Sequence, residues 1–146
     1  MDENGNPTRI PHDHAGYCCF YYRFKGNHII CCIQRPTVFK INFILAGPQF
    51  MVDAESFIAG IMERSQEITA FLNPLTNSYR RFGSYEAPRF ITWSHQNRSQ
   101  LIRIPAAKGE FNRMEIRSPD PACNPYWAFA LLISAGLDGI EKHLSL

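Results

Sequence analysis

Residues 97–125 read NRSQLIRIPAAKGEFNRMEIRSPDPACNP, and this stretch holds the elements that decide the fold. SQLIRI near 99–104 and RMEIR over 113–117 are predicted to be two strands joined by the AAKGEFN turn, and in RMEIR the polar and apolar residues alternate. Asn124 followed by Pro125 predicts the start of a helix, because asparagine caps helices and proline suits their first position. The stretch therefore predicts strand, turn, strand and helix in that order.

The RMEIR strand carries two different faces, because successive side chains on a strand point to opposite sides. Met114 and Ile116 share the apolar face. The polar face carries Arg113, Glu115 and Arg117. This polar face is either an ion-pair ladder on a solvated sheet, which adds little stability, or a binding site for an anion or metal.

Upstream, apolar residues recur at three- and four-residue intervals from Phe57 to Leu72, behind Asp53 as an acidic N-cap. This pattern predicts an amphipathic helix over 54–72, which Pro74 ends. The first ~45 residues mix aromatic and β-branched residues with turn formers, which indicates strands without fixing their ends. We therefore predict an α+β fold in which an antiparallel sheet is packed by helices.

Between these elements the sequence predicts a loop and one more strand. Residues 73–88, NPLTNSYRRFGSYEAP, have the Pro, Asn, Gly and Ser content of a long surface loop. RFITWS, near 89–94, is predicted to be a strand. In the final helix, Trp127 and Phe129 are predicted to be core residues.

Composition limits the classes of function. The 146 residues and a net charge of +2 predict a single globular unit without a polybasic surface. The positive charge is concentrated in one segment, because residues 80–117 contain eight basic residues and three glutamates. The five cysteines lack paired CxxC spacing and are predicted to be reduced thiols, and His12 and His14 to be exposed loop residues. With no secretory signal and no run long enough to span a bilayer, we expect a cytoplasmic chain without membrane contact.

Arginine dominates the cations around Glu115, accounting for five of six. Its planar guanidinium suits bidentate recognition of carboxylate and phosphate. A glutamate among arginines suits Mg²⁺ or Mn²⁺ bridging phosphate oxygens, because these ions take oxygen ligands. The pattern predicts a phosphoryl-transfer site with an acidic co-substrate.

Four motifs occur in order along this segment: NSYRRFGSYEAP, NRSQLIRIPAAKGE, RMEIRSPDPACNPY and AGLDGI. Together they resemble the C-terminal catalytic domain of bacterial type I glutamine synthetase, over a region from Ala54 to Ile140. On this resemblance, residues 51–146 are predicted to be a partial catalytic domain and residues 1–50 a divergent segment of unassigned role.

The resemblance implies an enzyme that ligates ammonia to glutamate with ATP, through γ-glutamyl phosphate and with Mg²⁺ or Mn²⁺ at the site. Glu86 would take a proton from ammonium on a mobile flap, and Arg98 would stabilise the transferring phosphoryl group. The resemblance further assigns Arg81 and Arg117 to substrate glutamate, Arg103 and Arg113 to the ATP phosphates, and Glu115 and His28 to the metal.

The resemblance also implies a homo-oligomeric double ring, in which the N-terminal domain of a neighbouring subunit completes each site. We therefore expect this chain to carry an incomplete site. Two alternatives stay open: a superfamily ligase that joins glutamate to a polyamine, and an inactive fragment that binds nucleotide or other subunits. Nucleic-acid binding ranks last, because the arginines lie between apolar strand residues.

Overall fold

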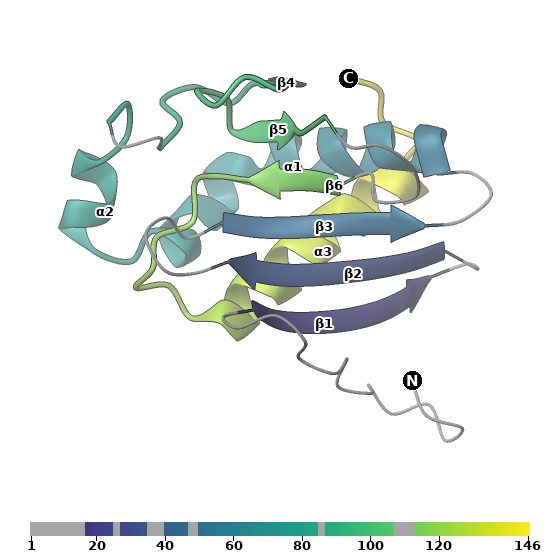
Figure 1. Ribbon diagram of the computed structural model, residues 1–146, viewed down its shortest axis with the longest axis horizontal. Helices are drawn as coiled ribbons and strands as arrows, with labels where there is room; N and C mark the ends of the chain where they lie inside the picture. Colours follow the sequence, from purple (N-terminus) through teal and green to yellow (C-terminus); the bar gives the residue numbers. More distant parts are fainter. Residues whose placement is uncertain (1–16, 25–26, 35–39, 47–49, 85–86, 107–112) are drawn as a thin grey trace.

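The RMEI segment forms an inner strand of a six-stranded sheet with the order β1-β2-β3-β6-β5-β4 (Figure 1). The computed structural model describes residues 17–24, 27–34, 40–46, 50–84, 87–106 and 113–146. Neighbouring strands are antiparallel except β4 and β5, which run parallel. The strands are β1 (Tyr17–Phe24), β2 (Asn27–Gln34), β3 (Lys40–Ala46), β4 (Trp93–His95), β5 (Ile102–Ile104) and β6 (Arg113–Ile116).

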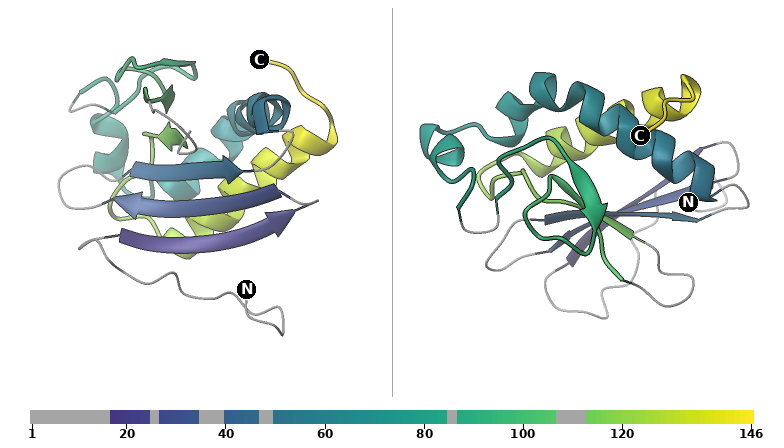
Figure 2. Two further views of the ribbon diagram at one scale, coloured as in Figure 1. Left: turned by 45° about the vertical axis from the view of Figure 1, so that its right-hand side comes forward. Right: turned by 90° about the horizontal axis from the view of Figure 1, so that it is seen from above.

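Two long helices, α1 (Phe50–Leu72) and α3 (Pro125–Glu141), lie on the same face of this sheet (Figure 2). A short helix, α2 (Thr76–Arg80), follows α1 at one end of the molecule (Figure 1). Among the described residues, no helix is both long enough and apolar enough to cross a membrane. The predicted α+β architecture, a sheet packed by helices, is confirmed.

The core lies between the sheet and the two long helices. Met114 and Ile116 of β6 are buried there beside Ile41 and Phe43 of β3. The ring of Phe43 meets the ring of Phe57 from α1, with centroids 5.4 Å apart. Because side chains alternate along a strand, the residue between Met114 and Ile116 points away from the helices. The apolar face predicted for RMEIR is therefore confirmed.

Two glycines let α1 and α3 touch through their backbones. A Cβ added to Gly60 would lie 2.2 Å from the carbonyl oxygen of Ala135, and one added to Gly139 would lie 2.2 Å from that of Ser56. Neither separation leaves room for a methyl group. The glycines thus set the closest approach of the two helices that cover the sheet.

The predicted helices agree with the structure in position. α1 ends at Leu72 as predicted but begins at Phe50, so that Asp53 lies in its first turn and does not cap it. Asn124 caps α3 as predicted, because its side chain accepts hydrogen bonds from the backbone N–H groups of Tyr126 and Trp127. The register of β3 against β6 joins the first part of the chain to the same sheet.

Three details differ from the predictions. The segment predicted as a loop contains α2. Two hydrogen bonds between Leu75 and Ser78 cap the N-terminal end of this helix. The strand predicted near 89–94 is limited to Trp93–His95 and pairs in parallel with β5. Trp127 was predicted to be core but is 57% exposed, because it stacks on Phe71 at the outer surface of the helices. Phe129 is buried as predicted.

Candidate functional site

Glu115 is a buried carboxylate held between two arginines. Arg117 Nη1 donates to Glu115 Oε1 at 2.8 Å, and Arg103 Nη1 approaches Oε2 at 3.4 Å. Arg103 also lies directly opposite Glu115 in the register of β5 and β6. Glu115 is only 4% exposed and Arg117 has no exposed surface. The predicted ion-pair ladder is present, but it lies in a buried layer and not on a solvated face.

Both carboxylate oxygens of Glu115 thus have a cationic partner, although the two contacts differ in quality. The contact with Arg117 has the length of a charge-assisted hydrogen bond, whereas the 3.4 Å contact with Arg103 is long for one. The Nε atom of Arg103 is buried and has no hydrogen-bond partner in the structure. Arg103 is therefore the more easily displaced of the two partners.

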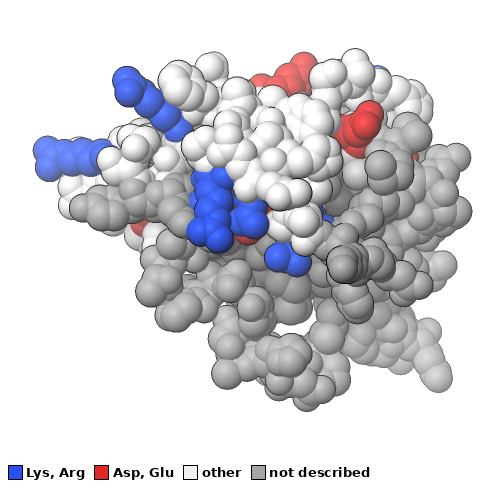
Figure 3. Space-filling view, turned by 45° about the horizontal axis from the view of Figure 1, so that its top comes forward, with Lys and Arg blue, Asp and Glu red and all other residues white. Residues whose placement is uncertain are grey.

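Arg113 stands at the beginning of the same strand and is exposed. On the face seen in Figure 3, Lys and Arg side chains lie toward the left and centre, and Asp and Glu side chains lie mostly toward the top and right. This distribution suits a surface that receives an anion.

Arg81, at the C-terminal end of α2, is fixed by two other segments of the chain. Its Nε lies 3.1 Å from Asp120 Oδ2, and its Nη2 donates to Asn73 Oδ1 at 2.9 Å and to the carbonyl oxygen of Ser118. Burial lowers the pKa of Arg81 below its ordinary value, and the neighbouring Asp120 carboxylate opposes that shift. Arg81 thus contacts the backbone of the residue that follows Arg117, the other arginine predicted to bind glutamate.

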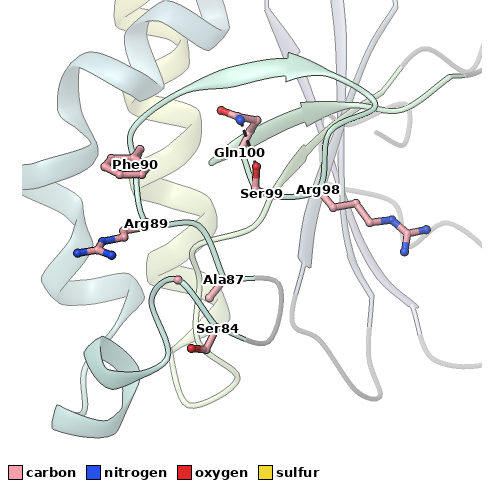
Figure 4. A pocket seen from close by; sticks show the side chains of 8 residues that line it. Ser84, Ala87, Arg89, Phe90, Arg98, Ser99 and Gln100 are labelled. Carbon is pink, nitrogen blue, oxygen red and sulfur yellow. Dashed lines mark hydrogen bonds between the residues drawn. The ribbon is translucent and has the colours of Figure 1, made fainter.

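An open pocket of about 460 Å³ lies between Gly83–Ser84 and Ser99–Gln100. Arg89 and Arg98 line it, but their side chains extend in opposite directions (Figure 4). Arg98 is exposed on the turn between β4 and β5. The two guanidinium groups therefore do not converge on one point. Glu86 lies outside the described residues.

The strand register places His28 and Glu115 apart. Glu115 pairs with Asn42, and Asn42 pairs with Cys32 of β2. His28 stands four residues before Cys32, two strands away from β6. In the described part of the chain, no group of three His, Cys, Asp or Glu side chains is placed to hold a metal ion.

Two residues of the site, Asn73 and Asp120, were missed in the sequence. Asn73 has no exposed surface, and Asp120 is mostly buried beside Arg81. Each precedes a proline, in LNP and PDP, and neither was predicted to belong to the site. No local pattern in the sequence indicates their contacts with Arg81.

Residues 47–146, more than half of the chain, match the family described as "Glutamine synthetase, catalytic domain". The chain belongs to this glutamine synthetase catalytic-domain family. Among curated relatives named glutamine synthetase, the protein of Methanosarcina mazei is 55% identical over 93 residues, which are 63% of this chain and 21% of the relative. That of Thermus thermophilus is 52% identical over 97 residues, 66% of this chain and 22% of the relative.

Solved structures of glutamine synthetase-like chains agree with this membership. A structure titled as a GmaS/ADP complex superposes with a TM-score of 0.60 at 28% identity. The aligned region is 73% of this chain and 28% of the GmaS chain. An apo GmaS structure gives a TM-score of 0.61 at 30% identity and covers 75% and 27%. The chain therefore spans about a fifth of the length of the curated glutamine synthetases that it matches.

Proposed function

We propose that this chain contributes to the ATP-dependent ligation of ammonia to glutamate, through a γ-glutamyl phosphate intermediate. The observation that carries the proposal is the buried Arg103–Glu115–Arg117 cluster, found in a chain of which 93 residues are 55% identical to a protein named glutamine synthetase. A carboxylate between two arginines can trade one cationic partner for a metal ion. The freed guanidinium then faces a phosphate.

The roles of the arginines follow from their placement. Arg103 and Arg113 are proposed to contact the ATP phosphates, because Arg103 lies opposite Glu115 on β5 and Arg113 lies two residues before it on β6. Arg98 is proposed to reach the transferring phosphoryl group from its exposed turn. Arg81 and Arg117 are proposed to hold substrate glutamate, supported by the contact of Arg81 with Ser118, the residue that follows Arg117. Glu86 is proposed as the proton acceptor for ammonium.

A magnesium or manganese ion fits the chemistry of Glu115. Mg²⁺ is commonly held by one or two carboxylates together with substrate phosphates, so Glu115 would supply one carboxylate of such a site. The ion supplies charge neutralisation of the transferring phosphoryl group when bound. His28 stays a prediction as a second ligand, and the strand register offers it no support.

The wider setting is also proposed. We propose that the parent enzyme is of the bacterial type I class, acts in the cytoplasm and forms a homo-oligomeric double ring whose neighbouring subunit completes the site. The incomplete ligand set of the described residues suits this arrangement. It equally favours the second candidate, a fragment that binds nucleotide without turnover.

The test is a calorimetric titration of the chain with a non-hydrolysable ATP analogue, with and without Mg²⁺, beside a γ-glutamyl transfer assay. Glu115→Gln is expected to weaken the Mg²⁺-dependent binding about tenfold or more. The control is Glu63→Gln, which removes an exposed carboxylate from α1 and should change nothing. Thermal unfolding of each variant separates loss of binding from loss of fold.

The outcomes distinguish the two candidates. Mg²⁺-dependent binding with turnover supports the ligase. Binding without turnover supports the inactive nucleotide-binding fragment. Equal binding by the Glu115→Gln and wild-type chains means that Glu115 does not hold the metal, and the proposed function then loses the observation on which it stands.

A further inference from the structure

The side chain of Arg81 is held by acceptors of three different kinds from two distant segments. Asn73 supplies an amide oxygen at the end of α1, Ser118 a backbone carbonyl after β6, and Asp120 a carboxylate two residues later. The two segments are also joined directly, because the backbone N–H of Asp120 donates to the carbonyl oxygen of Leu72 at 2.8 Å. Arg81 therefore adds side-chain contacts between two segments that a backbone hydrogen bond already joins.

The supporting groups are themselves fixed. The other carboxylate oxygen of Asp120 accepts from the backbone N–H of Ala122 at 2.8 Å, which locks its orientation. Asn73 is fully buried, and its Nδ2 lies 3.4 Å from the carbonyl oxygen of Thr69. Neither acceptor is a mobile surface group. The plane of the guanidinium is set by rigid partners on two sides.

These contacts involve the Nε and Nη2 atoms of the guanidinium and leave Nη1 aside. Arginine has five N–H donors, one on Nε and two on each Nη. Nε is buried 3.1 Å from Asp120 Oδ2 in an ion pair that lacks hydrogen-bond geometry, and Nη2 donates to both Asn73 and Ser118. Among the described residues Nη1 has no hydrogen-bond partner, and it is not one of the fully buried unpartnered atoms. The donor group left for a ligand is Nη1.

The neighbouring arginine shows what the fixed geometry adds. Arg80 precedes Arg81 in the RR pair but is exposed and makes no ion pair in the described part of the chain. A salt bridge needed only for stability would be met by Asp120 alone. The extra amide and carbonyl acceptors hold the guanidinium plane against rotation, which preorganises one donor group for an anion.

We infer that Asn73 and Asp120 are positioning residues, which aim Nη1 of Arg81 so that it binds a substrate carboxylate end-on. The inference rests on the proposed function in taking that carboxylate to be glutamate's. It adds that the bidentate mode usual for arginine is closed to Arg81, because Nε is buried against Asp120 and Nη2 is hydrogen-bonded to the protein.

The experiment follows the Arg81 Nε–H signal by NMR and titrates the full chain with L-glutamate. Arg81→Lys identifies the signal. Asn73→Leu removes the amide acceptor at similar volume, Asn73→Asp restores an acceptor, and Asp120→Asn removes the charge while keeping an oxygen for Ala122. Arg80→Gln is the matched control, since it removes the adjacent exposed charge without touching the three acceptors.

We expect a slowly exchanging Arg81 signal in the wild-type, Asn73→Asp and Arg80→Gln chains, and a fast-exchanging one in Asn73→Leu and Asp120→Asn. The Kd for glutamate should rise about tenfold in the latter two variants, as for the loss of a charge-assisted hydrogen bond. Asn73→Asp should bind as wild type does, a rescue that a merely structural effect would not produce.

Two results overturn the inference alone: an Arg81 signal that is mobile in the wild type, or glutamate binding that is abolished by Arg81→Lys yet unchanged in Asn73→Leu and Asp120→Asn. A wild-type chain that shows the ordered signal but no glutamate binding overturns the glutamate role in the proposed function, and the aiming role of the two residues with it. The NMR signal and the titration report these failures separately.

Discussion

Arg117 Nη1 lies 2.8 Å from Glu115 Oε1, and the Arg117 side chain has no exposed surface while that of Glu115 is 5% exposed. Removing one partner of such a pair leaves a buried charge without its counterion. Arg117→Met is therefore expected to lower the free energy of unfolding by about 3 kcal/mol, at the low end of the range for broken buried pairs because Arg103 still faces Glu115. Urea denaturation of both chains measures this loss.

The comparison for this prediction is Arg103→Met. Arg103 is 17% exposed and its contact with Glu115 is longer, at 3.4 Å, so the expected loss is clearly smaller. The double variant Glu115→Leu with Arg117→Met should recover much of the stability, because apolar replacement of a whole buried pair is often neutral. Equal losses in the two single variants would show that burial does not rank these contacts.

The contact of α1 with α3 predicts a strong effect of a single methyl group. Gly60→Ala places a Cβ 2.2 Å from the carbonyl oxygen of Ala135, so the helices must separate. A loss of about 2 kcal/mol or more in the free energy of unfolding is expected, as for overpacked cores. Chemical denaturation gives the value. Ser134→Ala, an exposed position on α3, should change it by less than about 0.5 kcal/mol.

Much of this fold was readable from the sequence, because its signals are local. The 3.6-residue period of α1, the Asn124-Pro125 start of α3 and the alternation in RMEIR each depend on neighbouring residues. The parallel pairing of β4 with β5 was not readable, because strand direction depends on how the chain returns to the sheet. The same holds for α2, whose single turn is too short to show a period.

The site was predicted by residue type but not by burial. Arginine content pointed to Arg103, Arg113 and Arg117 as one group, and the register places Arg103 opposite Glu115. Nothing in the sequence distinguishes the buried Arg81 from the exposed Arg80, because their environments are set by the distant Asn73 and Asp120. The contact with Ser118 spans 37 residues and that with Asn73 spans eight residues across a proline, so no motif links these partners.

The cap of α3 predicts a modest and specific effect. Asn124 Oδ1 accepts from the backbone N–H of Tyr126 at 3.0 Å, at a position where the following proline has no N–H to satisfy. Asn124→Ala should lower the free energy of unfolding by about 1 kcal/mol. Asn124→Asp keeps the acceptor and should stay close to wild type. A similar loss in both variants, measured by thermal unfolding, would show that the cap bond is not the cause.

The exposed position of Trp127 sets the size of the last expected effect. Its ring stacks on Phe71 with centroids 5.7 Å apart and planes at 6°, while the two side chains are 57% and 48% exposed. A core tryptophan replaced by alanine costs about 3–5 kcal/mol. For Trp127→Ala we expect about 1 kcal/mol, mostly from the stacking. Denaturation of this variant, of Phe71→Ala and of the double variant forms a double-mutant cycle. A coupling energy near zero would show that the stacking does not contribute to stability. A loss above about 3 kcal/mol for Trp127→Ala would show that Trp127 behaves as a core residue.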